Sequence, residues 1–393
     1  MSKRNRIIYA ILWVLSLVGI SFFGGPVSYG FFTLMTLLPV ISFLYLLFVS
    51  FSFRIYQELE GKNLVAGHTV PFYFILKNEF PFGFSSIRVR FFSDLSDILE
   101  LDDDEEYELQ PKTGIKKNTK VLCKYRGEYE VGIQSIEITD YFCLLKRKFN
   151  NKETLRVIVK PAIIELTELK TLNPNGKMTK ESAFHPTHPD VLVRRYEEGD
   201  DIRFVDWKSS AKSGELMVRK TIGEGREGIG IILPVKRCGK EASEYLPVEN
   251  KMLESAIALS WFFLRKNSPV SAYLATGTAE KDRKKGYYGN ASKEHFHDLY
   301  EWYSSVEFRD NLNEESLYFP VINSPEIYRS KMVFFVLQSL DTAAVSAIRK
   351  IHEQNIPVVV YYVSGLADEL KGRKLPNTEF IQIPPEADLK EVM

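Results

Sequence analysis

The sequence has 393 residues, of which 45% are hydrophobic and 26% are charged, a composition typical of folded proteins. This length is too great for one compact core, so two or three domains are expected. The chain has 51 basic and 51 acidic residues, and the first 57 positions hold four of the basic ones and none of the acidic ones. The remaining residues therefore have 47 basic and 51 acidic side chains and are nearly neutral. This balance argues against a general nucleic-acid-binding surface.

The first predicted element is a pair of membrane-spanning helices. No Asp, Glu, Lys, Arg or His occurs from Ile7 to Phe53. That stretch is about twice the roughly 20 apolar residues that a helix needs to cross a bilayer. The turn formers Gly24-Gly25-Pro26 divide it. Helices are therefore expected from about residue 7 to 23 and from about 31 to 53, so that residues 1–57 form a transmembrane hairpin.

The flanking charges predict the orientation of this hairpin. Lys3, Arg4 and Arg6 precede the first helix, Arg54 follows the second, and the connecting loop carries no charge. The positive-inside rule then places both ends in the cytoplasm, which makes the chain a two-pass protein of the plasma membrane with cytoplasmic soluble domains. The alternative, a cleaved signal peptide, is not favoured, because a second apolar segment follows at once without an A-x-A-like cleavage site.

Residues 58–164 carry a β pattern. Short segments alternate in polarity or are rich in β-branched residues, and Gly, Asn, Asp and Pro separate them. The expected strands cover residues 70–76, 86–92, 127–131, 135–139 and 155–159. This pattern predicts a small antiparallel β-sandwich of the immunoglobulin-like kind.

Three places were considered as metal sites, and no metal is predicted at any of them. The acidic stretch 102–106 lacks the D-x-D-x-D-G spacing of a calcium loop, so a solvated loop is favoured. His185, His188 and Asp190 lie in a polar, Pro-rich stretch without a fourth ligand nearby. The three cysteines are an odd number without a C-x-x-C pair, which suits a reducing compartment and excludes a zinc ribbon.

Residues 228–393 alternate between strands and helices. Expected strands cover residues 228–233, 270–275, 332–337 and 357–363, and expected helices cover 249–264, 293–306 and 342–354. Asp341 is placed to cap the last of these helices. Buried apolar strands alternating with helices predict an α/β domain built on a parallel, doubly wound sheet.

Residues 165–227 are expected to form a linker that ends in an unusual segment, residues 194–219, which we name the signature segment. Gly199 permits a turn, and Asp200 is expected to cap a short helix that begins at Asp201. Gly214 would end this helix, and a strand would follow over residues 215–220. Spacings of three and four residues would place a set of polar and aromatic side chains on one face of the helix: Arg203, Asp206 and Trp207.

Three functions are open for the signature segment. Paired charges and a Trp could form a clasp that locks the β domain onto the α/β domain. The same residues could instead form a docking site for a partner. An enzyme of unknown reaction would have to use the polar cluster of Asp200, Arg203, Asp206 and Lys208. The cluster has no His or Cys near it in sequence, and the chain has no G-x-S-x-G, H-E-x-x-H or P-loop motif, so an enzyme is not favoured.

The signature segment resembles that of a bacterial family catalogued as domain of unknown function 58. The likeness rests on the spacing of Arg194, Tyr196, Gly199, Asp200, Arg203, Asp206, Trp207, Lys208, Ser210 and Ala211, and Arg219 closes the segment. The resemblance implies a von Willebrand factor A-like C-terminal domain. It also implies association with MoxR-type AAA+ ATPases and often with transglutaminase-like membrane proteins. It implies no enzymatic activity and no cofactor.

Domains of the von Willebrand factor A kind usually bind Mg²⁺ through a D-x-S-x-S loop after the first strand, with a later Thr and Asp. Here that loop reads Pro234-Val235-Lys236-Arg237-Cys238, and Thr276, Thr278 and Asp341 are possible remnants of the other ligands. We expect Lys236 or Arg237 to offer a positive charge to a partner's carboxylate, with solvated loop cations as the alternative. The predicted function is a membrane-anchored scaffold or adaptor that works with a MoxR-type ATPase in assembly or maturation of envelope complexes.

Overall fold

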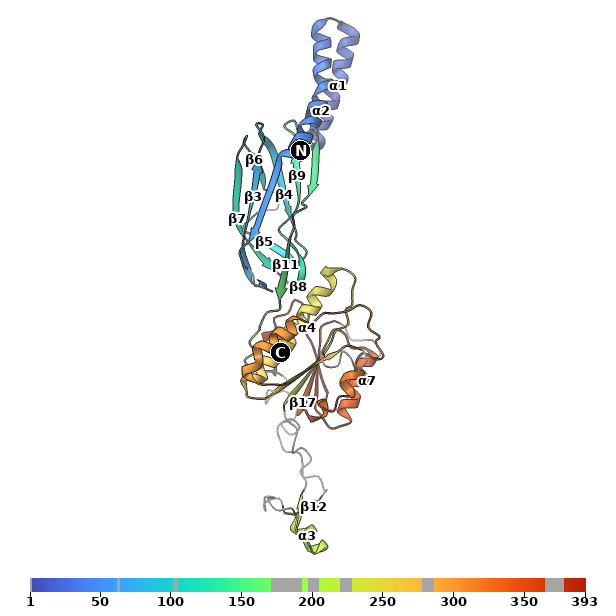
Figure 1. The fold of residues 1–393 in the computed structure, drawn as a ribbon. Coiled ribbons are helices and arrows are strands. Elements are labelled where there is room, and N and C mark those ends of the chain that lie inside the picture. The colour runs from blue at the N-terminus through green and yellow to red at the C-terminus, as the bar shows by residue number, and fades with distance from the viewer. Residues whose placement is uncertain are drawn as a thin grey trace. The chain divides into compact units, whose positions relative to one another are not determined.

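The structure, a computed structural model, describes residues 2–61, 64–101, 105–170, 193–196, 205–219, 228–277, 286–364 and 378–393. The chain divides into two compact units, Met1–Ala162 and Ile163–Met393. Figure 1 labels the elements of both units. Each unit is described by itself below.

The first unit begins with the predicted pair of apolar helices, α1 (Ser2–Phe23) and α2 (Pro26–Ser52). Both are long and apolar enough to cross a membrane. The prediction of a helix pair is confirmed, but α2 begins at Pro26 and not near residue 31. Proline fits the first turn of a helix because its missing N–H would have no partner there. Gly25, with φ 89°, makes the turn that an L side chain would resist.

The rest of the first unit consists of β-sheets, which are almost entirely antiparallel. One four-stranded sheet has the order β1-β3-β7-β5, a second has the order β10-β9-β4-β6, and a three-stranded sheet has the order β2-β11-β8. The strands are β1 (Phe53–Leu59), β2 (Leu64–Val65), β3 (Thr69–Asn78), β4 (Phe84–Phe91), β5 (Ser96–Leu99), β6 (Glu106–Leu109), β7 (Gly114–Cys123), β8 (Gly127–Val131), β9 (Ile133–Thr139), β10 (Lys146–Asn150) and β11 (Leu155–Lys160). The short pair β2–β11 is parallel.

The two four-stranded sheets share a core of aromatic and branched side chains. Phe74 of β3 is fully buried, and its ring contacts Phe91 of β4 at 5.6 Å and Tyr107 of β6 at 6.1 Å between centroids. These contacts join one sheet to the other, as in a β-sandwich. The five expected strands are present as β3, β4, β8, β9 and β11.

The second unit contains a six-stranded mixed sheet with the order β16-β15-β14-β17-β18-β19. Its strands are β14 (Ile229–Pro234), β15 (Val270–Ala275), β16 (Tyr287–Ala291), β17 (Met332–Leu337), β18 (Val358–Tyr362) and β19 (Thr378–Gln382). All neighbouring pairs are parallel except β15–β16. The predicted parallel sheet is therefore confirmed in its centre, but an antiparallel strand forms one edge.

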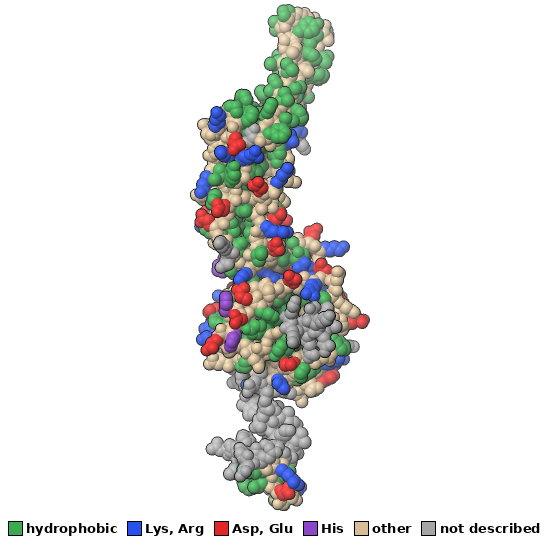
Figure 2. All heavy atoms as spheres, viewed as in Figure 1, with side chains coloured by type: hydrophobic (Ala, Val, Ile, Leu, Met, Phe, Trp, Pro, Cys, Tyr) green, Lys and Arg blue, Asp and Glu red, His purple; other side chains and the backbone are tan. Residues whose placement is uncertain are grey.

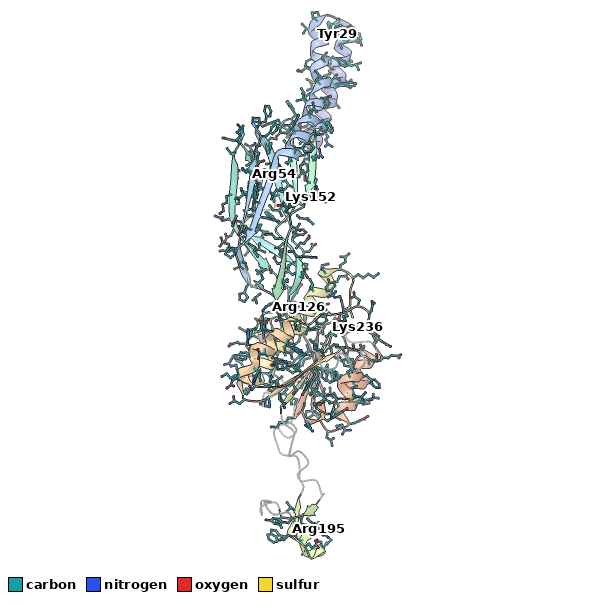
Figure 3. The ribbon with its side chains drawn as sticks, viewed as in Figure 1. Tyr29, Arg54, Arg126, Lys152, Arg195 and Lys236 are labelled. Carbon is teal, nitrogen blue, oxygen red and sulfur yellow. The ribbon has the colours of Figure 1, made fainter. Side chains whose placement is uncertain are left out.

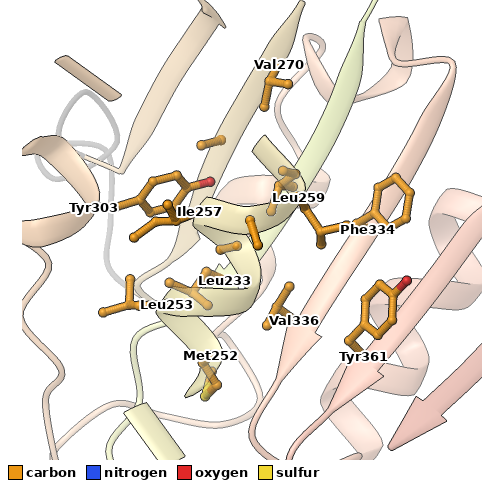
Figure 4. Packing of buried hydrophobic residues seen from close by; sticks show 14 of the residues in the cluster. Leu233, Met252, Leu253, Ile257, Leu259, Val270, Tyr303, Phe334, Val336 and Tyr361 are labelled. Carbon is orange, nitrogen blue, oxygen red and sulfur yellow. The ribbon is translucent and has the colours of Figure 1, made fainter. Parts of the chain in front are cut away.

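Helices cover both faces of this sheet. Alternate residues of each strand point to opposite faces, so Phe334 and Val336 of β17 join one core and Val333 and Phe335 join the other. The first core includes α4 (Ala242–Arg265) and α5 (Phe296–Ser304), and Figure 4 shows its packing. The second core includes α6 (Phe319–Ile322) and α7 (Thr342–His352). Strands buried on both faces explain the uninterrupted apolar runs in the sequence.

The first residues of the expected linker belong to the core of the second unit. Leu166 and Leu169 are buried, with 3% and 2% of their surface exposed, and they pack with α4 in the first of these cores. The backbone N–H of Lys170 donates a hydrogen bond to the carbonyl oxygen of Met393. Residues 163–170 are thus a strap on the α/β unit.

Candidate functional site

The strand order identifies one place on the sheet of the second unit where ligands are expected. β15 lies on one side of β14 and β17 lies on the other, so the chain reverses its direction of winding between β14 and β17. In open α/β sheets, ligands bind beyond the carboxyl ends of the strands at such a switch point. The residues that follow β14 and β17 are Val235–Cys238 and Gln338–Asp341.

A cluster of three charged residues lies beyond the carboxyl ends of these strands: Lys236, Glu314 and Asp341. We name this cluster the carboxyl edge. The Lys236 ammonium forms an ion pair with the Glu314 carboxylate, and the side chains are 21% and 60% exposed. Figure 3 labels Lys236 at the surface of the unit. Burial raises the pKa of Asp341; the negative charge of Glu314 acts in the same direction and the positive charge of Lys236 opposes it. Lys236 is therefore paired with Glu314 and also stabilises the charged form of Asp341.

Asp341 also has the structural role that the sequence predicts. Its carboxylate accepts a hydrogen bond of 2.6 Å from the backbone N–H of Ala344 and caps α7. Asp and Asn are among the best residues at this position because they satisfy N–H groups that the helix leaves unpaired. Asp341 thus fixes the start of α7 and lends a negative charge to the carboxyl edge.

Arg237, the second predicted cation, is 26% exposed and is paired with a buried acid of its own unit. Its guanidinium donates a 2.7 Å hydrogen bond to Glu249 of α4, whose side chain is 3% exposed. Its guanidinium carbon also lies 4.0 Å from the centre of the Tyr245 ring. These contacts attach the loop after β14 to α4. Lys236 therefore remains as the better placed of the two cations for a partner's carboxylate.

The described part of the signature segment forms a small β–α–β unit. β12 (Val193–Arg195) pairs with β13 (Met217–Arg219), and α3 (Trp207–Ser213) lies between them in sequence. The helix begins at Trp207 and not at Asp201 as expected, because Asp206 is extended and caps it. One carboxylate oxygen of Asp206 accepts hydrogen bonds of 3.0 Å from the N–H groups of Lys208 and Ser209.

Two more signature residues fix the fold of this unit. The Ser210 hydroxyl donates to the Asp206 carbonyl at 2.7 Å and accepts from the Met217 N–H at 2.8 Å, which ties α3 to β13. Gly214 ends the helix with φ 71°, as predicted. The motif residues Asp206, Ser210 and Gly214 therefore have local structural roles.

Other signature side chains point to solvent. Trp207 is 66% exposed, and Leu216 is 49% exposed. Arg195, labelled in Figure 3, pairs with Glu215 at 2.7 Å between exposed side chains, and the Tyr196 N–H donates to the Leu216 carbonyl at 2.8 Å. Lys208 is exposed as well. Trp207, Lys208 and Leu216 are therefore accessible at the surface of the described unit.

Several predicted positions lie outside the described residues. They are Gly199, Asp200 and Arg203, the side chains of Arg194 and Arg219, the His185, His188 and Asp190 group, and Thr278. Among the residues that the structure describes, no three His, Cys, Asp or Glu side chains are grouped to hold a metal ion.

Comparison with known families identifies the signature segment. Residues 192–287 match the model of the family described as protein of unknown function DUF58. This segment belongs to the DUF58 family. The match covers the signature segment and the loop cations Lys236 and Arg237, and it continues through β14, α4 and β15 to the first residue of β16. The DUF58 segment thus ends before Glu314 and Asp341, so part of the carboxyl edge lies beyond it.

Solved structures show only faint likeness to the chain. Salmonella alpha-2-macroglobulin reacted with methylamine has 16% identity and a TM-score of 0.22 over 28% of this chain and 7% of that one. The native conformation of E. coli alpha-2-macroglobulin has 17% identity and a TM-score of 0.20 over the same shares. The sporulation control protein Spo0M from Bacillus subtilis has 14% identity and a TM-score of 0.18 over 28% of this chain and 49% of that one.

This chain therefore spans 7% of the alpha-2-macroglobulins and about half of Spo0M, and their activities are not transferred to it. Comparison with curated proteins gave no match.

Sequence reasoning missed Glu314 and Glu249, the acidic partners of the two loop cations. Glu314 is 78 positions from Lys236, in a loop without a motif, and nothing in the local pattern marks it. Glu249 lies within the expected helix, where an acidic residue is ordinary. Only 2% of its surface is exposed, and the sequence gives no sign of this burial. A buried carboxylate requires a cation or several hydrogen bonds, so knowledge of burial would have identified the pair.

Proposed function

We propose that this DUF58 chain is a membrane-anchored scaffold, and not an enzyme, whose α/β unit offers its carboxyl edge to a carboxylate of a protein partner. The resemblance noted from the sequence suggests a MoxR-type AAA+ ATPase as that partner. It also suggests a von Willebrand factor A-like fold for the α/β unit and an immunoglobulin-like fold for the sandwich. The anchor would be the helix pair in the plasma membrane, with the soluble units in the cytoplasm.

The observation that carries this proposal is the Lys236–Glu314 pair at the switch point of the sheet. Lys236 is mostly buried, whereas Glu314 is 60% exposed. A partner is therefore more able to displace the Glu314 carboxylate from the pair than the Lys236 ammonium. Because Glu314 is largely exposed, an incoming carboxylate could take its place on Lys236 and leave the Glu314 carboxylate in water. Lys236 would then hold the partner as a metal ion holds a ligand in related sheets.

The acidic residues of the carboxyl edge and of the signature segment are poorly placed for catalysis. Asp341 and Asp206, which a hydrolytic reading would use as bases, cap α7 and α3 through their carboxylates. A nucleophile and a base within hydrogen-bond reach of each other are the usual requirement for covalent catalysis. Both carboxylates are thus already engaged in capping hydrogen bonds, which supports the scaffold over the enzyme.

A binding experiment with charge variants tests the proposal. The full chain in detergent would be immobilised, and binding of the host's MoxR-type ATPase would be measured with and without ATP. Lys236→Ala should weaken binding about tenfold or more, since a charge-assisted hydrogen bond contributes about 1.5–3 kcal/mol. Glu314→Gln should bind as well as wild type or better, because it removes the competing carboxylate.

Lys293→Ala is the matched control, because Lys293 is an exposed lysine of the same unit away from the carboxyl edge. It should bind like wild type. Equal binding by Lys236→Ala and wild type would refute the proposal. A loss of binding in Glu314→Gln as large as that in Lys236→Ala would also contradict it, because the intact pair and not the cation would then be required.

A further inference from the structure

We infer that one end of the β-sandwich is itself a membrane surface, formed by two aromatic loops that enter the lipid interface beside the helices. The loops are residues 79–83 between β3 and β4 and residues 140–145 between β9 and β10, and we name them the interfacial collar. This inference rests on the membrane anchoring in the proposed function. It adds a second lipid contact that is made by the β domain.

Both loops are attached to the helices by direct contacts. The Ser42 hydroxyl of α2 donates a buried 2.7 Å hydrogen bond to the Asp140 carboxylate. Arg6 of α1 donates to the Leu144 carbonyl at 2.8 Å. The ring centroids of Tyr45 and Tyr141 lie 5.1 Å apart. The helix pair and the 140–145 loop therefore form one packed end of the first unit.

The other loop is attached in the same way. The ring of Phe48 in α2 stacks on Phe80 at 5.9 Å, and Phe80 in turn lies 5.8 Å from Phe82. The Tyr45 hydroxyl donates to the Gly83 carbonyl at 3.2 Å. Buried Asn78 holds this loop in shape by donating to the Phe82 carbonyl at 2.8 Å.

The length of α2 sets the depth of the collar. Its 27 residues extend about 40 Å, which exceeds the roughly 30 Å of hydrocarbon in a bilayer. From Pro26 to Ser42 the helix extends about 24 Å. The hydrocarbon boundary therefore falls a few residues beyond Ser42, at the level where α2 contacts both loops. Arg6, the last charge before the apolar part of α1, contacts the same loop, which supports this level.

At this depth the collar exposes three aromatic side chains. Phe82 is 64% exposed, Tyr141 is 58% exposed and Phe142 is 52% exposed. Figure 2 shows hydrophobic side chains continuing from the helices onto the adjoining end of the sandwich. Aromatic residues favour the zone between hydrocarbon and headgroups. The collar is continuous with the lipid-facing surface of the helices, so the fitting partner is the same bilayer.

Basic side chains next to the collar suit anionic headgroups. Arg147 and Lys148 are exposed on β10, which begins at the collar. Arg54 follows α2 and lies 3.8 Å from Glu79 of the collar, so its charge is partly balanced there. Lys and Arg near an anionic membrane surface are attracted to its headgroups. The collar thus combines exposed aromatic side chains with nearby basic ones. The bilayer is therefore expected to bind the sandwich directly, in addition to the covalent connection through α2.

Depth-dependent quenching in nanodiscs tests this inference on the full chain. Single cysteines would replace Phe82, Phe142, Ile158 or Leu37 in a background of Cys143→Ser and Cys238→Ser, with buried Cys123 retained. Each would carry an environment-sensitive fluorophore. The nanodiscs would contain phosphatidylcholine and phosphatidylglycerol, with and without brominated acyl chains. Labels at positions 82 and 142 should shift to shorter wavelength and be quenched by the brominated chains.

Ile158 is the matched control, because it is an apolar residue of the same sandwich that is 70% exposed on β11. Its label should remain unquenched. Leu37 of α2 reports on the anchor, and absence of quenching there would overturn the proposed anchoring itself. Quenching at Leu37 without quenching at positions 82 and 142 would overturn only the collar. A shifted but unquenched label at positions 82 and 142 would also overturn it, since a protein surface would then cover the collar.

Discussion

Replacing Trp207 with Ala separates the two structural roles that the signature segment could have. In a clasp the indole would be buried between domains, and its removal would cost about 3–5 kcal/mol of stability. In a docking site the indole is exposed in the unbound protein, and its removal would affect mainly binding. The structure gives Trp207 an exposed fraction of 66%, which allows the smaller cost to be worked out.

A buried Trp side chain removes up to about 250 Å² from water. With about a third of its surface covered, Trp207 removes roughly 80 Å² at about 25 cal/mol per Å², which gives an upper limit near 2 kcal/mol. This cost falls on α3 alone, a helix of seven residues without a buried residue. We therefore expect Trp207→Ala to loosen α3 and to leave the six-stranded sheet as stable as before.

Hydrogen exchange measured by mass spectrometry on the detergent-solubilised chain resolves these regions separately. Peptides from α3 should exchange faster in Trp207→Ala, and peptides from β14 and β17 should keep their protection. Asp206→Ala should act like Trp207→Ala through loss of a cap that contributes about 1 kcal/mol, and Asp206→Asn should resemble wild type. Loss of about 3 kcal/mol or more of protection in β17 would show that the indole is part of a clasp and that this reasoning is wrong.

Three further predictions concern buried polar groups. Glu249→Gln should lower the stability of the α/β unit by about 3 kcal/mol in calorimetry, because it leaves the Arg237 charge partly buried without its anion. Burial raises the pKa of Asp341 above its ordinary 3.8, so the folded chain holds this proton more tightly than the unfolded chain, and stability should fall as pH rises above 3.8. Asp341→Asn, which keeps the cap, should remove that fall. Ser42→Ala should speed hydrogen exchange in residues 140–145, because the buried Asp140 carboxylate loses a donor that contributes about 1.5–3 kcal/mol.

These predictions have internal controls. Glu165→Gln removes an exposed partner of Arg265, with side chains that are 63% and 47% exposed, and should change stability by less than about 1 kcal/mol. If it costs as much as Glu249→Gln, burial is not the deciding factor. Asp341→Asn should match wild type at pH values below 3.8. Ser50→Ala, also in α2, should leave residues 140–145 unchanged, since Ser50 donates within its own helix.

The sequence predicted strands that form continuous apolar runs and strands with a clear alternation, such as β8, which has its predicted bounds. β15 and β17 were predicted at their observed bounds, because each is buried on both faces and forms a continuous apolar run. β7 was missed because it is half exposed and carries lysines on both faces, which conceal the alternation: Lys116 and Lys120 on the exposed face and Lys117 on the other. β16 and β19 lie at the edges of the sheet and are mostly accessible to solvent, so their polar residues gave no strand signal.

The candidate site was predictable only as far as it depends on local chain geometry. The position of Lys236 after the first strand follows from the order of the elements, and the cap at Asp341 follows from its place before an expected helix. The start of α3 was misplaced because Asp200 and Asp206 are equally good caps in sequence. The strand pairing of Val205 with Val218 decides between them, since it holds residue 205 extended. Such long-range pairing has no signature in a single sequence.

The direct junction between α2 and β1 supports the scaffold proposal, because it limits the motion of the sandwich relative to the helices. Phe53 is both the residue that caps α2 and the first residue of β1, so the first unit has no linker between helix and sheet. The loops of the collar hold the same end by hydrogen bonds to Ser42 and Arg6. A domain that is joined by a helix–strand junction and by side contacts keeps its tilt, whereas a flexible tether would let it turn freely. With the anchoring proposed above, the sandwich of the first unit should therefore keep a fixed tilt to the bilayer.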